Sequence, residues 1–211
     1  MTDRAIIFID GSNWYHSLKN AGITGSGELD YPKICRKLVG PARQWIATRY
    51  YVGRVNQEEA PKLYADQRIF FSRLCAADSR ITAHFGRLET RLTHNKAAEE
   101  LKHYLANLSI RIDPTVYHDL VALAGRHRNV RVTGEKAVDV KLAVDMVVMA
   151  ERGEYDTAYL LTADGDFTPA VEAVRQLGKR VYAASPAKGA QLAQAVNTYI
   201  PLNKAWFSDC W

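Results

Sequence analysis

The chain opens on a short, continuous run of apolar residues. Ala5–Ile9 carries no polar side chain and ends at Asp10-Gly11-Ser12-Asn13. An apolar run of this length predicts a strand that is buried on both faces, and the polar residues after it predict a turn into a helix. Asp10 is therefore expected at the carboxyl end of a strand. In open α/β sheets, ligand sites gather at that edge.

Apolar periodicities further along the chain predict alternating strands and helices. The expected strands cover residues 48–55, 80–90, 157–162 and, as the final strand, 180–184; the expected helices cover 31–38, 61–77, 138–151, 169–177 and, in the tail, 187–196. Gly178 fits the C-terminal cap of the helix before it. Strands that alternate with helices predict an α/β fold whose central, mostly parallel sheet is flanked by helices.

Residues 91–131 have the least regular pattern. They contain helical patches at about 97–108 and 116–123 and the basic segment Arg126-His127-Arg128. We predict a single domain over residues 1–211, with room for a helical insertion at about 92–130 and a C-terminal extension from about 186. The extension carries Trp206 and Trp211, which either form a docking surface or fold back on the core.

Composition places the chain among ordinary globular proteins, since 47% of its 211 residues are hydrophobic and 24% are charged. No apolar run approaches the roughly 20 residues that span a bilayer, and Ala5–Ile9 is too short for a secretory signal. We therefore expect a cytoplasmic protein with no membrane contact. Its three cysteines are widely separated and lack CxxC spacing, which indicates free thiols rather than disulfides or a zinc site.

The basic balance of the chain favours a polyanionic partner. The net charge is +5 and the isoelectric point is about 9.1, which is too mild to define that partner alone. A basic surface combined with a carboxylate cluster is more informative, because basic groups attract a phosphate backbone while acids hold a metal that reacts with it.

Two acidic turns each follow an apolar strand. The first is at Asp10, and the second is Ala163-Asp164-Gly165-Asp166. If the two strands are parallel neighbours, their carboxylates converge at one edge, and a divalent cation is the ordinary way to offset the resulting repulsion. Carboxylate oxygens select Mg²⁺, Mn²⁺ or Ca²⁺ over zinc. The alternative interpretation of either turn is a helix N-cap.

A third acidic element is the predicted helix that contains Asp139 and Asp145. These residues are six positions apart, about 240° around a helix, so they cannot point the same way. We favour Asp139 for the site, because a residue near the start of the helix can project past the sheet edge. Asp145 stays a candidate metal ligand, with a structural hydrogen-bonding role as the alternative.

Three motifs in this order resemble a known family. They are Asp10-Gly-x-Asn13, the segment from Glu135 to Asp145, and Thr162-Ala163-Asp164-Gly165-Asp166-Phe167-Thr168-Pro169. The set looks like a NYN domain of the LabA-like group, a relative of the PIN nucleases, over roughly residues 4–185. Ala163 stands where such proteins more often have Gly.

The resemblance implies a three-layer PIN-like fold and metal-dependent cleavage of RNA. Carried over by position, Asp10, Asp139, Asp164 and Asp166 would form an acidic quartet that holds Mg²⁺ or Mn²⁺, and Asn13 would bind or orient beside it. The metal would activate water as the nucleophile and stabilise charge in the transition state. The expected substrate is single-stranded RNA.

Several neighbouring residues are candidates for substrate binding. Lys136, Lys141 and Arg87 are expected either to contact phosphate or to lie on a solvated surface. Ser12 has no visible partner base for covalent catalysis, and we assign it to substrate binding with Asn13.

Trp14 and Tyr15, which follow the first acidic turn, are expected either to stack on a base or to pack in the core.

Two other functions remain open from the sequence. One is a nucleic-acid-binding or regulatory module with little turnover. The other is a nucleotide phosphatase, which is weakened because no second aspartate stands two residues after Asp10. A homodimer is also left open.

Overall fold

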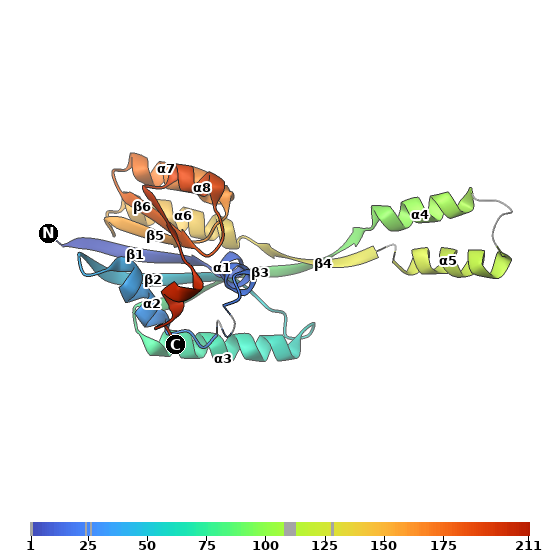
Figure 1. Cartoon of the computed structure of the whole chain (residues 1–211), viewed down its shortest axis with the longest axis horizontal. Coiled ribbons are helices and arrows are strands. Elements are labelled where there is room, and N and C mark those ends of the chain that lie inside the picture. The colour runs from blue at the N-terminus through green and yellow to red at the C-terminus, as the bar shows by residue number, and fades with distance from the viewer. Residues whose placement is uncertain (1, 24, 26, 108–112, 128) are drawn as a thin grey trace. The chain divides into compact units, whose positions relative to one another are not determined.

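The computed structural model describes residues 2–23, 25, 27–107, 113–127 and 129–211, and within these ranges it describes all side chains except those of 87–92 and 130–136. Figure 1 shows the elements, whose bounds in chain order are β1 (Asp3–Asp10), α1 (Gly11–Asn20), α2 (Tyr31–Val39), β2 (Arg43–Arg54), α3 (Pro61–Ala77), β3 (Ile81–His94), α4 (Lys96–Ala106), α5 (Pro114–Arg126), β4 (Asn129–Lys136), α6 (Val138–Glu151), β5 (Thr157–Leu161), the 3₁₀ helix η1 (Gly165–Phe167), α7 (Thr168–Gln176), β6 (Arg180–Ser185), α8 (Ala190–Ala195), β7 (Thr198–Pro201) and the 3₁₀ helix η2 (Lys204–Phe207).

The strands form one sheet in the order β4-β3-β2-β1-β5-β6-β7. The six strands from β3 to β7 in this order are parallel to their neighbours. The predicted α/β fold with a central parallel sheet is therefore confirmed, and it is consistent with a PIN-like fold. Strand β1 lies in the middle, so the turn that follows it is flanked by other strand ends.

The apolar run in β1 explains why this strand is central. Its residues alternate between two hydrophobic cores: Ile7 and Ile9 belong to one core, whereas Ile6 and Phe8 belong to the other. All four are fully buried. Because successive side chains of a strand point to opposite faces, a strand covered on both faces needs an apolar residue at every position.

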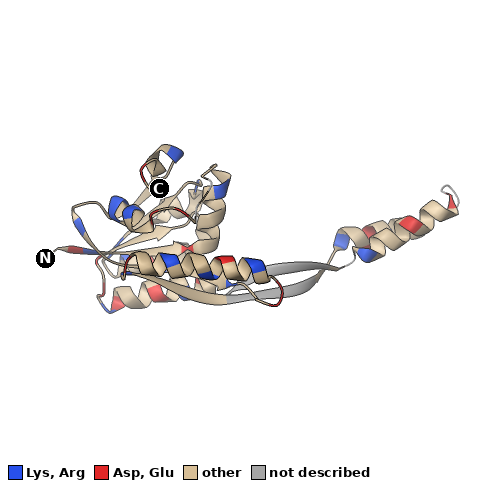
Figure 2. Ribbon diagram, turned by 90° about the horizontal axis from the view of Figure 1, so that it is seen from below, with Lys and Arg blue, Asp and Glu red and all other residues tan. Residues whose placement is uncertain are grey.

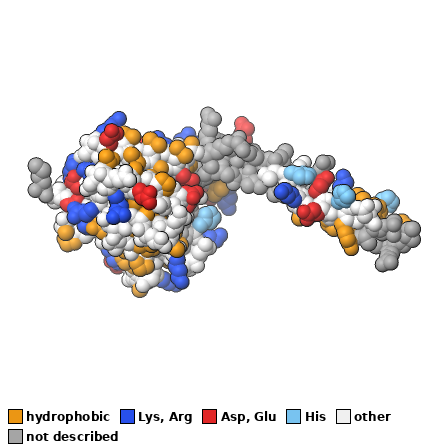
Figure 3. All heavy atoms as spheres, turned by 90° about the horizontal axis from the view of Figure 1, so that it is seen from above, with side chains coloured by type: hydrophobic (Ala, Val, Ile, Leu, Met, Phe, Trp, Pro, Cys, Tyr) orange, Lys and Arg blue, Asp and Glu red, His pale blue; other side chains and the backbone are white. Residues whose placement is uncertain are grey.

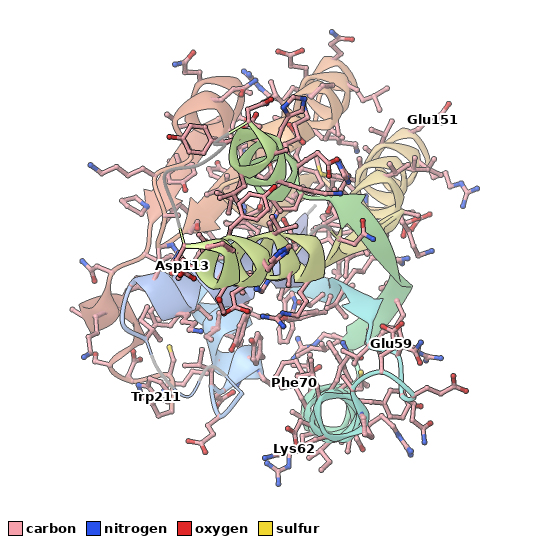
Figure 4. All side chains as sticks on the ribbon, turned by 90° about the vertical axis from the view of Figure 1, so that its right-hand side faces the viewer. Glu59, Lys62, Phe70, Asp113, Glu151 and Trp211 are labelled. Atoms are coloured by element: carbon pink, nitrogen blue, oxygen red, sulfur yellow. The ribbon has the colours of Figure 1, made fainter. Side chains whose placement is uncertain are left out.

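Helices cover both faces of the sheet. The large buried hydrophobic residues of α1, α2 and α3 belong to the core that contains Ile7, and those of α6, α7 and α8 belong to the core that contains Phe8. Figure 4 shows how α3 is oriented: Phe70 lies on the side facing the sheet, and Lys62 lies on the opposite side. The result is a three-layer arrangement of helices, sheet and helices.

The chain divides into two compact units. Unit 1 comprises Met1–Arg87 and Glu135–Trp211, and unit 2 comprises Leu88–Gly134. Unit 2 contains α4 and α5 together with parts of β3 and β4. It encloses the range 92–130, for which the sequence indicates an insertion.

The strands differ from the predictions in several places, and β3 extends to His94 rather than ending at residue 90. β4 and β7 were not expected, so β6 is not the final strand, and β2 begins at Arg43 rather than at residue 48. β7 has only four residues, too few to show a period. The polar start of β2 is accommodated because Arg43 Nε donates to Asp3 Oδ2 at 2.7 Å.

The C-terminal segment folds back on the core around α1. Phe207 and Cys210 are buried in this core, and the ring centroids of Phe207 and Trp14 lie 6.1 Å apart. Lys37 Nζ donates to the carbonyl oxygen of Trp206 at 2.5 Å. Trp211, by contrast, is 55% exposed.

The three cysteines are free, as the sequence indicates. Cys35 and Cys210 are buried, whereas Cys75 is only partly buried. Within the described part of the chain, no helix combines the length and the apolar character that crossing a bilayer requires.

Candidate functional site

Asp10 ends β1 and is buried, with only 3% of its surface exposed. One carboxylate oxygen, Oδ1, caps α1 by accepting from the backbone N–H of Asn13 at 3.2 Å. The other, Oδ2, accepts from the hydroxyl of Thr162 at 2.9 Å. The N-cap interpretation of this turn is therefore correct, and the same side chain also reaches the end of β5.

Thr162 joins the two acidic turns. It directly follows β5, which is parallel to β1 with Leu161 opposite Ile9. Its fully buried hydroxyl donates to Asp10 and accepts from the backbone N–H of Asp164 at 3.1 Å. The convergence of the two turns, expected from the sequence, is thus made through one threonine side chain.

Asn13 forms a second link between the turns. Its Oδ1 accepts from the backbone N–H of Ala163 at 3.0 Å and from the hydroxyl of Ser17 at 3.3 Å. The carbonyl end of the side chain is therefore used to hold α1 against the turn after β5. Binding of substrate through Asn13 stays a prediction.

The second acidic turn resembles the first in its local chemistry. Asp164 caps η1, because its Oδ1 accepts from the backbone N–H of Asp166 at 2.9 Å. Asp164 is half-buried and Asp166 is exposed. Both carboxylates follow the same strand end that Thr162 fixes to Asp10.

Asp139 is the second residue of α6. Its carboxyl interacts electrostatically with the acids of this turn. It is solvent-exposed, yet loss of part of its hydration, followed by the negative charges of Asp164 and Asp166, raises the pKa of its carboxyl. Like charges disfavour each other's ionised form only when they are close. The structure therefore brings Asp139, Asp164 and Asp166 into one region of negative potential.

This group of donors fits a hard divalent cation in chemistry, because carboxylate oxygens are the ligands that Mg²⁺ and Mn²⁺ prefer. Among the described residues, however, no three His, Cys, Asp or Glu side chains converge closely enough to hold a metal ion. The acids are therefore neighbours without forming a closed cage. The exposed side chains of Asp139 and Asp166 have the rotamer freedom to adjust to an ion.

Asp145 lies outside this group. Its Oδ2 accepts from Arg49 Nη2 at 2.9 Å and from the Tyr51 hydroxyl at 2.8 Å. The contacts tie α6 to β2 and place a cation beside the carboxylate. They favour the structural hydrogen-bonding role over metal binding.

The predicted substrate-binding residues that the structure describes have different surroundings. Ser12 is half-buried in the first turn of α1, next to Asp10. Lys141 is exposed on α6 and lies near His84, where its charge helps to lower the pKa of the imidazole. The side chains of Arg87 and Lys136 lie outside the described residues.

The aromatic residues after the first turn have different environments. Trp14 is fully buried and belongs to the core, whereas Tyr15 is 49% exposed. Stacking on a base therefore remains open only for Tyr15. Thr162 was not assigned a role from the sequence, although its place between a buried strand and an acidic turn is a usable signal for a residue that links the two turns.

Comparison of the sequence with models of protein families shows which family the chain belongs to. A family model described as NYN domain matches residues 4–203. The chain belongs to the NYN family. The three sequence motifs all lie within the matched range, and membership in this family points to a PIN-like nuclease.

Other comparisons add the fold but no activity. A search of curated proteins found no match to this NYN domain. Among solved structures, the chain is similar to a protein of unknown function from Vibrio parahaemolyticus, with 13% sequence identity and a TM-score of 0.53 over 96% of this chain and 94% of the other. At this identity the likeness shows a shared fold alone.

Proposed function

We propose that this NYN domain is a metal-dependent ribonuclease and that its metal ion is Mg²⁺ or Mn²⁺. One observation carries the proposal: Thr162 joins Asp10 to the turn whose acids, Asp164 and Asp166, raise the pKa of Asp139. These contacts support a site to which four carboxylates from three separate segments contribute. The order of the motifs further supports the LabA-like group.

The reaction we propose is hydrolysis of a phosphodiester bond. A bound divalent ion would make water more acidic and screen negative charge on the phosphate. The water oxygen forms a bond to phosphorus, the bond from phosphorus to the 3′ oxygen breaks, and a water proton ends on that 3′ oxygen. No side chain of the protein needs to form a covalent bond with the substrate.

The four aspartates have different tasks in this scheme. Asp10 is held at the end of β1 by its hydrogen bonds with the backbone N–H of Asn13 and the hydroxyl of Thr162, and it would supply carboxylate oxygen to the ion. Asp139 and Asp166 are exposed and complete the ligand set when an ion enters. Their mutual repulsion, which is evident at Asp139, favours binding of a cation.

The substrate we propose is single-stranded RNA in the cytoplasm. The net charge of +5 supports attraction to a polyanion, and the exposed ring of Tyr15 is available for stacking. Lys141 lies on the same helix as Asp139. Contacts of Lys136 and Arg87 with phosphate remain part of the proposal.

A second function is a nucleic-acid-binding module with little turnover. The observation that favours it is the lack, among the described residues, of three acidic, His or Cys side chains arranged to hold a metal ion. Such a protein would bind RNA through the same edge without cleaving it.

Cleavage of a labelled single-stranded RNA in Mn²⁺, in Mg²⁺ and in EDTA tests the proposal. We expect cleavage in either metal, none in EDTA, and a loss of about a hundredfold or more in Asp10→Asn and Asp164→Asn. Asp66→Asn, an exposed change on α3, is the matched control. Full activity of both site variants, or cleavage in EDTA, would contradict the ribonuclease; RNA binding without cleavage would support the second function.

A further inference from the structure

Unit 2 contains a helical hairpin with very little core. Helices α4 and α5 contact each other and lie side by side in Figure 1. Among the described residues of these helices, the buried apolar ones are Ala98, Leu105 and Ala124. A pair of helices this short cannot reach independent stability with so small a core.

The same two helices expose large apolar side chains. The exposed fractions are 42% for Leu101, 65% for Tyr104, 48% for Val116 and 41% for Leu123. Figure 3 shows hydrophobic side chains on the surface of these helices. Unit 2 thus exposes large apolar side chains to solvent, although few of its described apolar residues are buried.

Helical periodicity collects these side chains on one face of the hairpin. In α4 the outer stripe is Ala97-Leu101-Tyr104, in which Ala97 and Tyr104 precede the buried Ala98 and Leu105 by one residue. In α5 the outer stripe is formed by the exposed Val116 and Leu123 with the half-buried Leu120 between them, and Leu123 precedes the buried Ala124 by one residue. One residue is 100° around a helix. Because the offset is the same and the helices run in opposite directions, both outer stripes lie on one face, which we call the hairpin face.

The positive and negative charges of the two helices are balanced in number. Helix α4 carries two lysines and two glutamates, and α5 carries Asp119 and Arg126. Figure 2 shows both signs interspersed on these helices. A surface of balanced charge does not repel a copy of itself, and it offers no net attraction to the phosphates of a nucleic acid.

We propose that the hairpin face docks on the same face of a second copy of this chain. A two-fold interface requires one patch to complement itself, and two hairpins joined through stripes spaced by three and four residues form a four-helix bundle. Each hairpin would then bury the side chains that it exposes alone. This inference is independent of the proposed nuclease activity.

Sedimentation velocity on the full chain tests this dimer across a hundredfold range of protein concentration. We expect the wild type to reach twice the chain mass of 23.7 kDa. Tyr104→Glu and Val116→Glu place a charge on the hairpin face and should raise the dissociation constant about tenfold or more. Ala122→Glu adds the same charge at an exposed position away from this face, and it should leave the constant unchanged.

Hydrogen exchange on the wild type gives a readout that does not depend on a variant folding. Protection of the α4 and α5 amides should rise with protein concentration as dimers form. A wild type that stays monomeric throughout would overturn the proposal. So would a dimer that both glutamate variants form with wild-type affinity, or exchange in α4 and α5 that ignores concentration.

Discussion

The hydroxyl of Thr162 takes part in two hydrogen bonds, one as donor and one as acceptor. It donates to a carboxylate oxygen of Asp10 and accepts from the backbone N–H of Asp164, while being fully buried itself. Valine has nearly the same shape but neither function. A substitution of Thr162 by valine therefore removes the hydrogen bonds while it keeps most of the packing.

Thr162→Val should lower the free energy of unfolding by about 1–3 kcal/mol, because a buried carboxylate and a backbone amide lose their partner. It should also reduce RNA cleavage, since the two acidic turns lose one of their links. Urea unfolding and a cleavage assay measure the two effects. Thr162→Ser keeps the hydroxyl and should recover most of both; a Val variant with wild-type stability and activity would contradict this role.

His84 illustrates how burial and neighbouring cations act on one side chain. Loss of hydration and the charge of Arg49 lower its pKa to about 4, with Lys141 adding to the effect and Asp145 opposing it. Its ring stacks on Tyr51 with centroids 4.9 Å apart. The folded protein therefore holds this imidazole neutral where the unfolded chain binds a proton.

The folded-state pKa of His84 is below the unfolded value of about 6.5, so its contribution to stability is complete above pH 6.5 and is lost as pH falls toward 4. The loss should be about 1–2 kcal/mol, since the ring is partly exposed. Unfolding by urea at several pH values measures it. His84→Gln should show a flatter profile, whereas His118→Gln, an exposed change on α5, should follow the wild type.

At the scale of the element, Gly11 sets how closely α1 approaches the sheet. A Cβ atom at this position would lie 2.3 Å from Cε1 of Tyr50 and 2.6 Å from the carbonyl oxygen of Tyr51. The second of these atoms belongs to the backbone of β2, which cannot move without disturbing the ladder with β1. The glycine is therefore required for the turn that carries Asp10.

Gly11→Ala should destabilise the protein by about 2 kcal/mol or more, because the added methyl group meets a strand backbone. Gly165→Ala is the comparison: there a Cβ atom would lie 2.5 Å from Oε1 of Gln191, the end of a flexible side chain. Thermal unfolding of both variants measures the difference. A smaller loss for Gly11→Ala than for Gly165→Ala would contradict the argument.

Elements with strong local signals were predicted from the sequence, and elements defined by distant contacts were not. The unbroken apolar run in β1 and the helical periodicities of α3 and α6 were sufficient, and α6 has the predicted bounds, Val138–Glu151. β7 could not be predicted, because four residues beside β6 form a strand only through that neighbour. The same limit applies to Asp145, whose partners on β2 are far away in sequence.

At the scale of the whole molecule, the candidate site depends on segments that the sequence keeps far apart. The acids come from the end of β1, the start of α6 and the turn after β5. Their residue types and their positions after strands were readable from the sequence. The bridge through Thr162 was not, because its hydrogen bonds depend on the pairing of β1 with β5.

Binding of Mn²⁺ should raise the midpoint of thermal unfolding, because an ion that binds only the folded state stabilises it. At a concentration about a hundredfold above the dissociation constant, the gain is about 2.7 kcal/mol. Asp164→Asn should lose most of this shift, and Asp66→Asn should keep it. Equal shifts in wild type and Asp164→Asn would place the ion elsewhere.

The strand order has a consequence for synthesis of the chain. β1 is synthesised before β2 and β5 but lies between them in the sheet. The edge of β1 that pairs with β5 therefore has no strand partner until residues 157–161 have been added. A nascent polypeptide that ends before β5 holds Asp10 without Thr162, Asp164 or Asp166. If the protein cleaves RNA as we propose, it acquires that capacity only after β5 and the acidic turn that follows it have been translated.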